Sequence, residues 1–151
     1  MLKDNVNLYA VFEENEPTNL NKNWVSTDPG IYTLSKTYDG FYFVKYNKPK
    51  YFEYSSLSQE INIDLNGYKE IQFELLMPKD SSFILKIEGP NGYLENKYFG
   101  SGKIETYSII IDKNLSEEEL KSFDHIYIFI DYYKETSSAQ YYIYNVTPIK
   151  E

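Results

Sequence analysis

The chain has 151 residues, the length of one ordinary domain. It carries 15 basic residues, all of them lysine, against 23 acidic ones, which gives a formal charge of −8. An acidic chain without arginine is poorly suited to bind nucleic acid or anionic lipid, and the absence of cysteine excludes disulfides and thiolate chemistry. No apolar run approaches the roughly 20 residues of a membrane span. The 42% hydrophobic and 18% aromatic content predicts a folded core.

Apolar and polar residues alternate with a period of two through most of the chain, which predicts short β-strands separated by turns. Turn residues such as Gly, Pro, Asn and Asp recur at roughly ten-residue intervals between them. In chain order, the expected strands are 8–12, 24–26, 31–36, 41–46, 51–55, 60–65, 70–75, 83–88, 93–99, 105–112, 124–131 and 140–146.

One segment has the pattern of a helix. Ser116 is followed three residues later by Glu119, a capping box, and Leu120 and Phe123 supply apolar anchors. The sequence therefore predicts an all-β fold, a two-sheet antiparallel β-sandwich (jelly roll) with one short helical turn near 116–123. We expect a single domain over residues 1–151, because no linker, repeat or low-complexity tract interrupts the pattern.

The expected strand 124–131 separates isoleucines on one face from aromatic and charged residues on the other. In a sandwich the isoleucine face is buried, so Tyr127, Phe129 and Asp131 should point to solvent. The same alternation turns polar side chains of two further strands outward, namely Gln72, Glu74, Lys86 and Glu88. If these strands share a sheet, its outer face combines aromatic rings with amides, carboxylates and an amine.

That combination suits a sugar, whose C–H faces lie on aromatic rings while its hydroxyls need planar hydrogen-bonding groups. Tyr93 and Tyr98 flank a turn and are candidates for the rim of a groove; ordinary hairpin packing is the alternative. Trp24 is a candidate for ligand stacking and equally for anchoring the core. For any single exposed ring there is an alternative explanation: it forms a cross-strand pair that stabilises the sheet and contacts no ligand.

Catalysis is not expected. His125, with Asp124 and Asp131, suggests a charge pair, but the chain offers no coherent nucleophile and base, so a structural role is expected for it. Glu74 and Glu88 form a conceivable carboxylate pair for glycoside hydrolysis. An open sheet face does not exclude water or raise one carboxyl pKa by burial, so this pair is not expected to catalyse.

Several short motifs occur in an order that resembles the β-sandwich carbohydrate-binding modules of polysaccharide-degrading enzymes. The matching segments, in chain order, are Phe12-Glu13-Glu14, Trp24, Tyr38-Asp39-Gly40, Leu65-Asn66-Gly67-Tyr68-Lys69-Glu70-Ile71-Gln72-Phe73 and Tyr142-Ile143-Tyr144-Asn145-Val146. The resemblance covers nearly the whole chain. It implies a jelly-roll fold and non-catalytic binding of a polysaccharide, with Trp24 and the outward sheet positions as contact residues.

Many such modules hold a structural calcium between an acidic residue of the first strand and an aspartate of the last. Here Glu13 is the only candidate ligand that matches, because Tyr144 stands where the aspartate is expected. The resemblance therefore implies no complete calcium site, and no cofactor is expected.

The implied ligand is a plant cell-wall β-glucan, mannan or xylan. The implied partner is a catalytic domain in the same full-length chain, secreted or held at the cell surface. Residues following Met1 lack the pattern of a signal peptide. The alternative function is a protein-interaction or adhesin domain of a surface protein, whose exposed rings contact protein instead of sugar.

Overall fold

The computed structural model describes residues 19–26, 32–47, 56–133 and 138–151, with only the backbone described at 32, 46–47, 131–133 and 138–139. The strands expected at 8–12 and 51–55 lie outside these residues. Among the described helices, none is long and apolar enough to cross a membrane.

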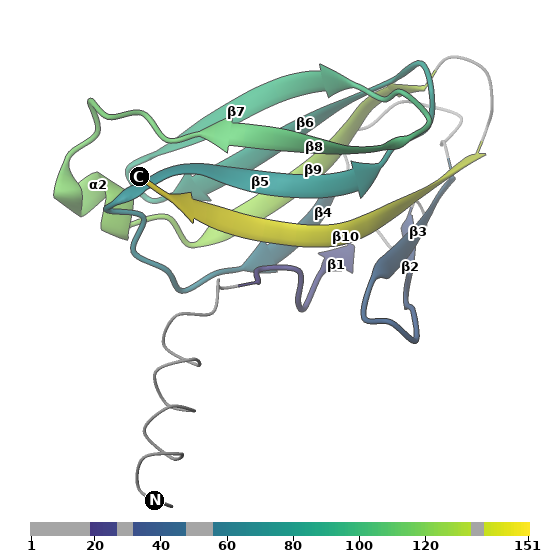
Figure 1. Cartoon of the computed structure of the whole chain (residues 1–151), viewed down its shortest axis with the longest axis horizontal. Coiled ribbons are helices and arrows are strands. Elements are labelled where there is room, and N and C mark those ends of the chain that lie inside the picture. The colour runs from purple at the N-terminus through teal and green to yellow at the C-terminus, as the bar shows by residue number, and fades with distance from the viewer. Residues whose placement is uncertain (1–18, 27–31, 48–55, 134–137) are drawn as a thin grey trace, which may run out of the picture.

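Two five-stranded antiparallel sheets stack face to face, which confirms the predicted β-sandwich (Figure 1). Sheet A has the order β1-β4-β9-β6-β7, with β1 (Val25–Ser26), β4 (Ser56–Glu60), β9 (His125–Tyr133), β6 (Ser81–Gly89) and β7 (Gly92–Phe99). Sheet B has the order β2-β3-β10-β5-β8, with β2 (Tyr32–Lys36), β3 (Tyr42–Asn47), β10 (Ser138–Lys150), β5 (Tyr68–Leu76) and β8 (Ile104–Ile110).

The core lies between the sheets and follows the alternation of the sequence. Inward residues of β9, β6 and β5 are almost completely removed from solvent, which fits the stripes of apolar residues predicted for these strands. The fully buried members from these three strands are Ile71, Phe73, Leu75, Phe83, Leu85, Ile87, Ile126 and Ile128. Burial of each such side chain contributes roughly 1.5–3 kcal/mol, so the inward faces dominate the stability of the sandwich.

The short helix α2 (Glu117–Lys121) confirms the predicted helical turn. The hydroxyl of Ser116 accepts a hydrogen bond from the Glu119 backbone N–H, and the Glu119 carboxylate accepts one from the Ser116 backbone N–H. Leu120 is the buried anchor of the helix. Figure 1 places α2 at one end of the sandwich, near the C-terminus.

The expected strand 60–65 is wrong, because strand β4 ends at Glu60 and the following residues pair with no strand. Their alternation has another cause. The Ile61 backbone N–H bonds to the Asp124 carbonyl and the Leu65 N–H to the Leu120 carbonyl, while the Leu65 side chain is fully buried. The segment is an extended connection that covers the end of the core without joining a ladder.

A β-bulge in β10 alters which of its side chains reach the surface. The register against β5 shifts between Ile143 and Asn145, so Tyr144 is the extra residue. As a result Ile143 and Val146 are both buried, and Tyr144 and Asn145 between them both lie at the surface. The bulge thus places a ring beside an amide on the outside of sheet B.

At one side of the sandwich, β7 of sheet A and β8 of sheet B run past each other as edge strands. The Tyr98 hydroxyl donates to the Ser108 carbonyl at 2.6 Å and accepts from the Ser108 N–H at 3.3 Å. The Asn96 side-chain oxygen accepts from the Ile110 N–H at 3.4 Å. Side chains of β7 therefore satisfy backbone groups along the free edge of β8.

Candidate functional site

The outer surface of sheet A, here called face A, carries most of the residues that the sequence singled out. Strand pairing aligns outward positions of four neighbouring strands across this surface. Its side chains are Ser58 of β4, His125, Tyr127 and Phe129 of β9, Ile84, Lys86 and Glu88 of β6, and Tyr93, Glu95 and Lys97 of β7. The two sets of residues expected from strands 83–88 and 124–131 therefore share one face.

A row of three aromatic rings follows β9 on face A. The ring centroids of His125 and Tyr127 are 6.0 Å apart and those of Tyr127 and Phe129 are 5.6 Å apart, with interplanar angles of 18° and 27°. The rings occupy alternate positions of one strand, so they stand on the same side of the sheet. On the opposite side of β9, Ile126 and Ile128 are fully buried, which confirms the predicted inside–outside assignment.

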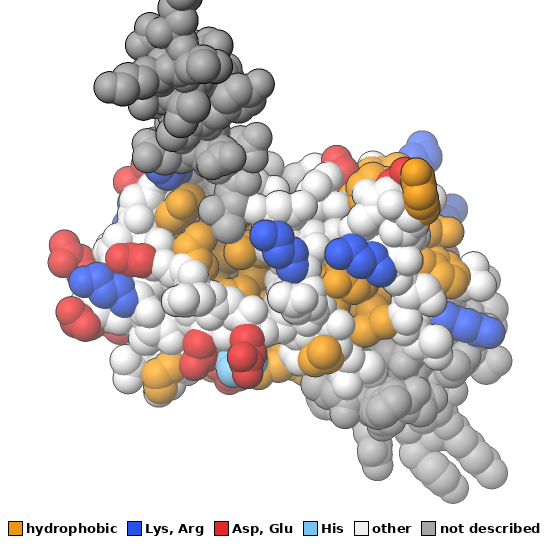
Figure 2. Space-filling model, turned by 90° about the horizontal axis from the view of Figure 1, so that it is seen from below, with side chains coloured by type: hydrophobic (Ala, Val, Ile, Leu, Met, Phe, Trp, Pro, Cys, Tyr) orange, Lys and Arg blue, Asp and Glu red, His pale blue; other side chains and the backbone are white. Residues whose placement is uncertain are grey.

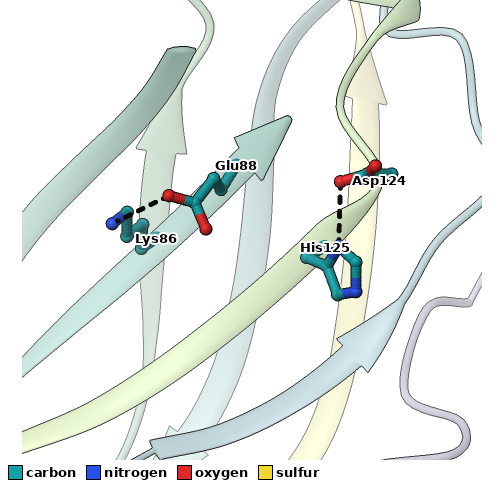
Figure 3. Close-up of polar contacts among 4 residues, drawn as sticks. All are labelled: Lys86, Glu88, Asp124 and His125. Carbon is teal, nitrogen blue, oxygen red and sulfur yellow. Dashed lines mark hydrogen bonds and ion pairs between the residues drawn. The ribbon is translucent and has the colours of Figure 1, made fainter. Parts of the chain in front are cut away.

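Beside the rings, Lys86 and Glu88 of β6 form an ion pair with 3.4 Å between Nζ and Oε1 (Figure 3). The Lys86 ammonium also lies 4.6 Å from the centre of the Tyr93 ring, a cation–π contact. Burial raises the pKa of Tyr127 above its ordinary value, and the nearby Glu88 carboxylate raises it further. The Tyr127 phenol therefore stays neutral and able to donate a hydrogen bond over the physiological pH range.

The start of the ring row adjoins an open depression of about 570 Å³ between β4, β1 and the beginning of β9. Its lining is Asn23, Val25, Ser58, Gln59, Glu60, Ile61, Asn62 and His125. His125 borders both the depression and the ring row, and its Nδ1 lies 2.8 Å from the Asp124 carboxylate (Figure 3). Figure 2 shows the histidine in pale blue beside acidic side chains in red. Rings and polar groups are therefore continuous across face A.

Gln72 and Glu74 do not lie on face A, because strand 70–75 does not share a sheet with strands 83–88 and 124–131, and their placement beside the rings depended on that condition. They belong to β5, which lies between β10 and the edge strand β8 of sheet B, and they point to the opposite side of the molecule. We call this opposite surface face B. Its outward residues include Phe41, immediately before β3, Phe43 of β3, Gln72 and Glu74 of β5, Thr106 of β8, and Tyr142, Tyr144, Asn145 and Thr147 of β10.

Trp24 and Tyr98, two further candidates, face the interior. The Trp24 side chain is 4% exposed and its indole N–H donates to the Asn21 side-chain oxygen at 2.8 Å, which matches the core-anchoring alternative. Tyr98 packs against Phe83 and Tyr107, with ring centroids 6.0 and 5.1 Å apart. Its hydroxyl is engaged with the edge of β8. Neither ring is presented on face A.

Two candidates are not described at side-chain level. Asp131 belongs to β9, but only its backbone is described, and Glu13 lies outside the described residues. Tyr144, at the position where the resemblance predicts an aspartate, contacts Phe41 and Tyr142. Within the described ranges, no three His, Asp or Glu side chains come close enough together to hold a metal ion.

Sequence reasoning missed two groups of surface residues. Ser58 and Asn62 line the depression on face A. Ser58 lies between the strands expected at 51–55 and 60–65, and Asn62 lies inside the wrongly expected strand 60–65. The Gln59 side chain beside Ser58 is buried and donates to the Leu20 carbonyl, so the polar run of β4 gave no sign of an inward face. The rings of face B were expected in strands 41–46 and 140–146 but were not assigned to a surface.

Neither a family model nor a curated protein sequence matches the chain. Solved structures do match its fold. A family 11 carbohydrate-binding module from Clostridium thermocellum in complex with a β-1,3-1,4-mixed-linked tetrasaccharide is 16% identical, with a TM-score of 0.58 over 85% of this chain and 89% of that one.

Two other structures are similar to the same degree. The module TmCBM61 in complex with β-1,4-galactotriose is 17% identical, with a TM-score of 0.56 over 93% of this chain and 94% of that one. The xylan-binding module CBM86 from Roseburia intestinalis is 13% identical, with a TM-score of 0.54 over 86% and 97%. The chain therefore has the fold of the β-sandwich carbohydrate-binding modules.

Proposed function

We propose that this domain binds a neutral polysaccharide on face A and does no chemistry on it. The observation that carries the proposal is the row of His125, Tyr127 and Phe129, which is partly exposed beside Lys86 and Glu88 on one sheet surface. Rings offer C–H stacking area, and the ammonium, carboxylate and phenol groups offer hydrogen bonds to hydroxyls. The fold shared with carbohydrate-binding modules supports this reading of the surface.

The charge of the domain favours a neutral ligand over a polyuronate. The whole chain carries a formal charge of −8, and the residues on and beside face A include Glu60, Glu88, Glu95 and Asp124. The basic residues of face A are Lys86, which is paired with Glu88, and Lys97, so carboxylates outnumber ammonium groups on this side. A polyanion would meet repulsion, whereas glucans, mannans, xylans and galactans would not.

In this proposal the domain is an accessory module. A secreted or surface-held enzyme in the same full-length chain would be kept close to its substrate, which raises the effective concentration without new contacts at the catalytic centre. The open sheet surface suits an extended chain because it leaves room for successive sugar units along the strands.

The test is affinity electrophoresis through gels containing mixed-linked β-glucan, xylan, galactan, mannan or polygalacturonate. We expect retardation by at least one neutral polymer and none by polygalacturonate. Tyr127→Ala with Phe129→Ala should weaken binding by about 1–3 kcal/mol, by analogy with base–aromatic stacking. Tyr38→Ala is the matched control, because Tyr38 is fully exposed in the β2–β3 turn.

Unchanged retardation of the double variant would remove face A from the proposal. No retardation by any of the neutral polymers, combined with capture by a purified protein ligand, would favour the adhesin alternative.

A further inference from the structure

Face B carries its own group of aromatic rings, contributed by two adjacent strands. Tyr142 and Tyr144 of β10 stack with their centroids 5.8 Å apart and an interplanar angle of 15°. Phe43 lies 5.1 Å from Tyr142, and Phe41 meets Tyr144 edge-on at 4.8 Å. All four side chains are partly exposed, so they form a ring platform on the surface of sheet B.

Polar groups line a hollow next to this platform. The hollow measures about 240 Å³, and its lining is Gln72, Glu74, Thr106, Asn145, Thr147 and Ile149. The Asn145 amide donates to Glu74 Oε1 at 3.0 Å, which orients both groups. The bulge in β10 places Tyr144 directly before Asn145 on the outside, so the platform and the hollow are contiguous.

The pKa of Tyr144 reflects how close the ring platform lies to the polar hollow. Burial raises the pKa of Tyr144, and the neighbouring Tyr142 and then Glu74 raise it further. The phenol is therefore a neutral hydrogen-bond donor close to a carboxylate and an amide. Two near-parallel rings beside planar acceptors and donors form the same chemical combination as on face A, built from different strands.

We propose that face B is a second saccharide-binding surface. Tyr142 and Tyr144 provide the stacking platform, and Glu74 and Asn145 bind hydroxyl groups of a sugar seated in the hollow. The ligand class is a neutral saccharide, because an acidic group there would face Glu74 and Glu70. The proposal goes beyond binding on face A, since the two surfaces share no residue and lie on opposite sides of the sandwich.

A contact with another protein is the competing occupant, and the surface fits it less well. Stable protein interfaces have an apolar centre surrounded by a polar rim. On face B the rings lie over β3 and the central strand β10, whereas the polar hollow lies over β10, β5 and the edge strand β8. The apolar and polar groups therefore lie side by side instead of forming a centre and a rim. That lateral division matches a ligand with a C–H face and a hydroxyl edge.

Two faces on one small domain make it bivalent. A module that holds one polysaccharide chain on each side cross-links them, and two sites on the same polymer raise the apparent affinity through effective concentration. Soluble polysaccharide should then increase in viscosity or precipitate with the native chain, and should not do so when either face is disabled.

The experiment uses the full chain and isothermal titration with the β-1,3-1,4-linked tetrasaccharide and β-1,4-galactotriose, followed by gel retardation in the polymers named above. Four proteins are compared: wild type, a face A variant (Tyr127→Ala, Phe129→Ala), a face B variant (Tyr144→Ala), and their combination. We expect two sites per chain in the wild type for a saccharide that binds, and one site in each face variant. Tyr144→Ala should weaken polymer binding at least about fivefold, the low end for a stacked ring.

Folding of the variants is checked by circular dichroism, with Tyr38→Ala as the exposed-tyrosine control. Should Tyr144→Ala fail to fold, Glu74→Gln with Asn145→Ala takes its place, because both side chains reach the surface. That pair should remove the second site while leaving the fold unchanged.

The outcomes separate the two proposals. One site per chain that disappears in the face A variant, with face B variants binding as the wild type, overturns the second surface and keeps the first. Binding that survives in the face A variant and disappears when Tyr144→Ala is added supports face B and overturns face A. A change of sedimentation from dimer to monomer in Tyr144→Ala, with saccharide binding unaltered, assigns face B to protein contact and overturns its role here. Wild-type protein that binds none of these saccharides overturns both.

Discussion

Face A and face B arise from the same alternation of residues, yet they are built differently. On face A three rings follow one strand, β9, the charged pair Lys86–Glu88 comes from the neighbouring strand β6, and the Tyr93 ring of β7 lies against Lys86. On face B the rings come from two strands, and the polar contact is an uncharged amide on a carboxylate, Asn145 to Glu74. A row along one strand suits an extended polymer, whereas a platform beside a hollow suits a shorter stretch of sugar.

The difference also shows how a bulge changes a surface. Regular strands such as β9 offer one outward side chain in every two residues. The bulge in β10 offers two in succession, Tyr144 and Asn145, and joins the ring platform to the polar hollow. Face A has no such bulge among its three rings, so its polar groups come from a separate strand.

The comparison of the two faces requires that both sets of rings lie outside the core. Substitutions of buried and surface residues on the same strands test this, and they should have the largest effect on the free energy of unfolding. Ile128→Ala and Ile143→Ala remove fully buried side chains and should each cost about 2–5 kcal/mol of unfolding free energy. Tyr127→Ala and Tyr142→Ala, one position earlier on the same strands, should each cost under about 1 kcal/mol, as for surface cross-strand pairs. Urea unfolding measures all four.

If Tyr127→Ala or Tyr142→Ala proved as destabilising as its isoleucine neighbour, the ring concerned would be part of the core. The corresponding face would then lose its claim to bind a ligand.

Alkaline pH should have a smaller effect on stability, and one tyrosine of each face should contribute to it. The pKa values of Tyr127 and Tyr144 are both raised in the folded protein, so the stability they contribute is fully present below the unfolded pKa of about 10. It is lost as pH rises through the folded pKa values. Tyr127→Phe and Tyr144→Phe should each make the fall in melting temperature at high pH shallower.

Burial is the largest cause of the raised pKa for both tyrosines, but the second cause differs, and one variant can separate Tyr127 from Tyr144. Glu88→Gln should move the pKa of Tyr127 back toward its ordinary value and leave that of Tyr144 unchanged. Ultraviolet titration of tyrosinate in Glu88→Gln, with and without Tyr127→Phe, measures this. An equal response of both tyrosines would mean that the faces are electrostatically coupled.

The smallest expected effect is that of a chelator. Tyr144 occupies the position where the resemblance predicts a calcium ligand, and it serves the ring platform of face B instead. Treatment with EDTA should therefore leave the melting temperature and binding by both faces unchanged. A fall that added calcium reverses would show that ligands outside the described residues hold a metal.

Local pattern was enough to predict which side chains of β5, β6 and β9 point inward, because burial imposes a period of two on each strand. It was not enough to predict which strands are neighbours. β5 and β6 are consecutive in the chain but belong to different sheets, and β9 pairs with β4 and β6 from far along the sequence. Such pairing depends on non-local contacts, so Gln72 and Glu74 were placed on the wrong side of the molecule.

Two smaller features could not be predicted either, because they also depend on contacts that the local sequence pattern does not show. Trp24 is held inside by the side chain of Asn21, a contact that no strand pattern encodes. In 41–46 and 140–146 aromatic residues occupy both faces. Tyr42 and Tyr141 are buried and their aromatic neighbours are partly exposed, so alternation of hydrophobicity could not tell the two sides apart. The bulge that completes face B has no sequence signature of its own.

The contacts of Tyr98 and Asn96 with β8 affect the tendency of the domain to aggregate at high concentration. An uncovered strand edge is a template on which a second chain can add its own strand, the first step of fibrous aggregation. Under the proposed function, copies gathered along a polymer would reach a high local concentration, where that risk is greatest. The two side chains occupy the amide and carbonyl of Ser108 and the amide of Ile110. A strand of a neighbouring copy therefore cannot hydrogen-bond to these backbone groups and extend the sheet.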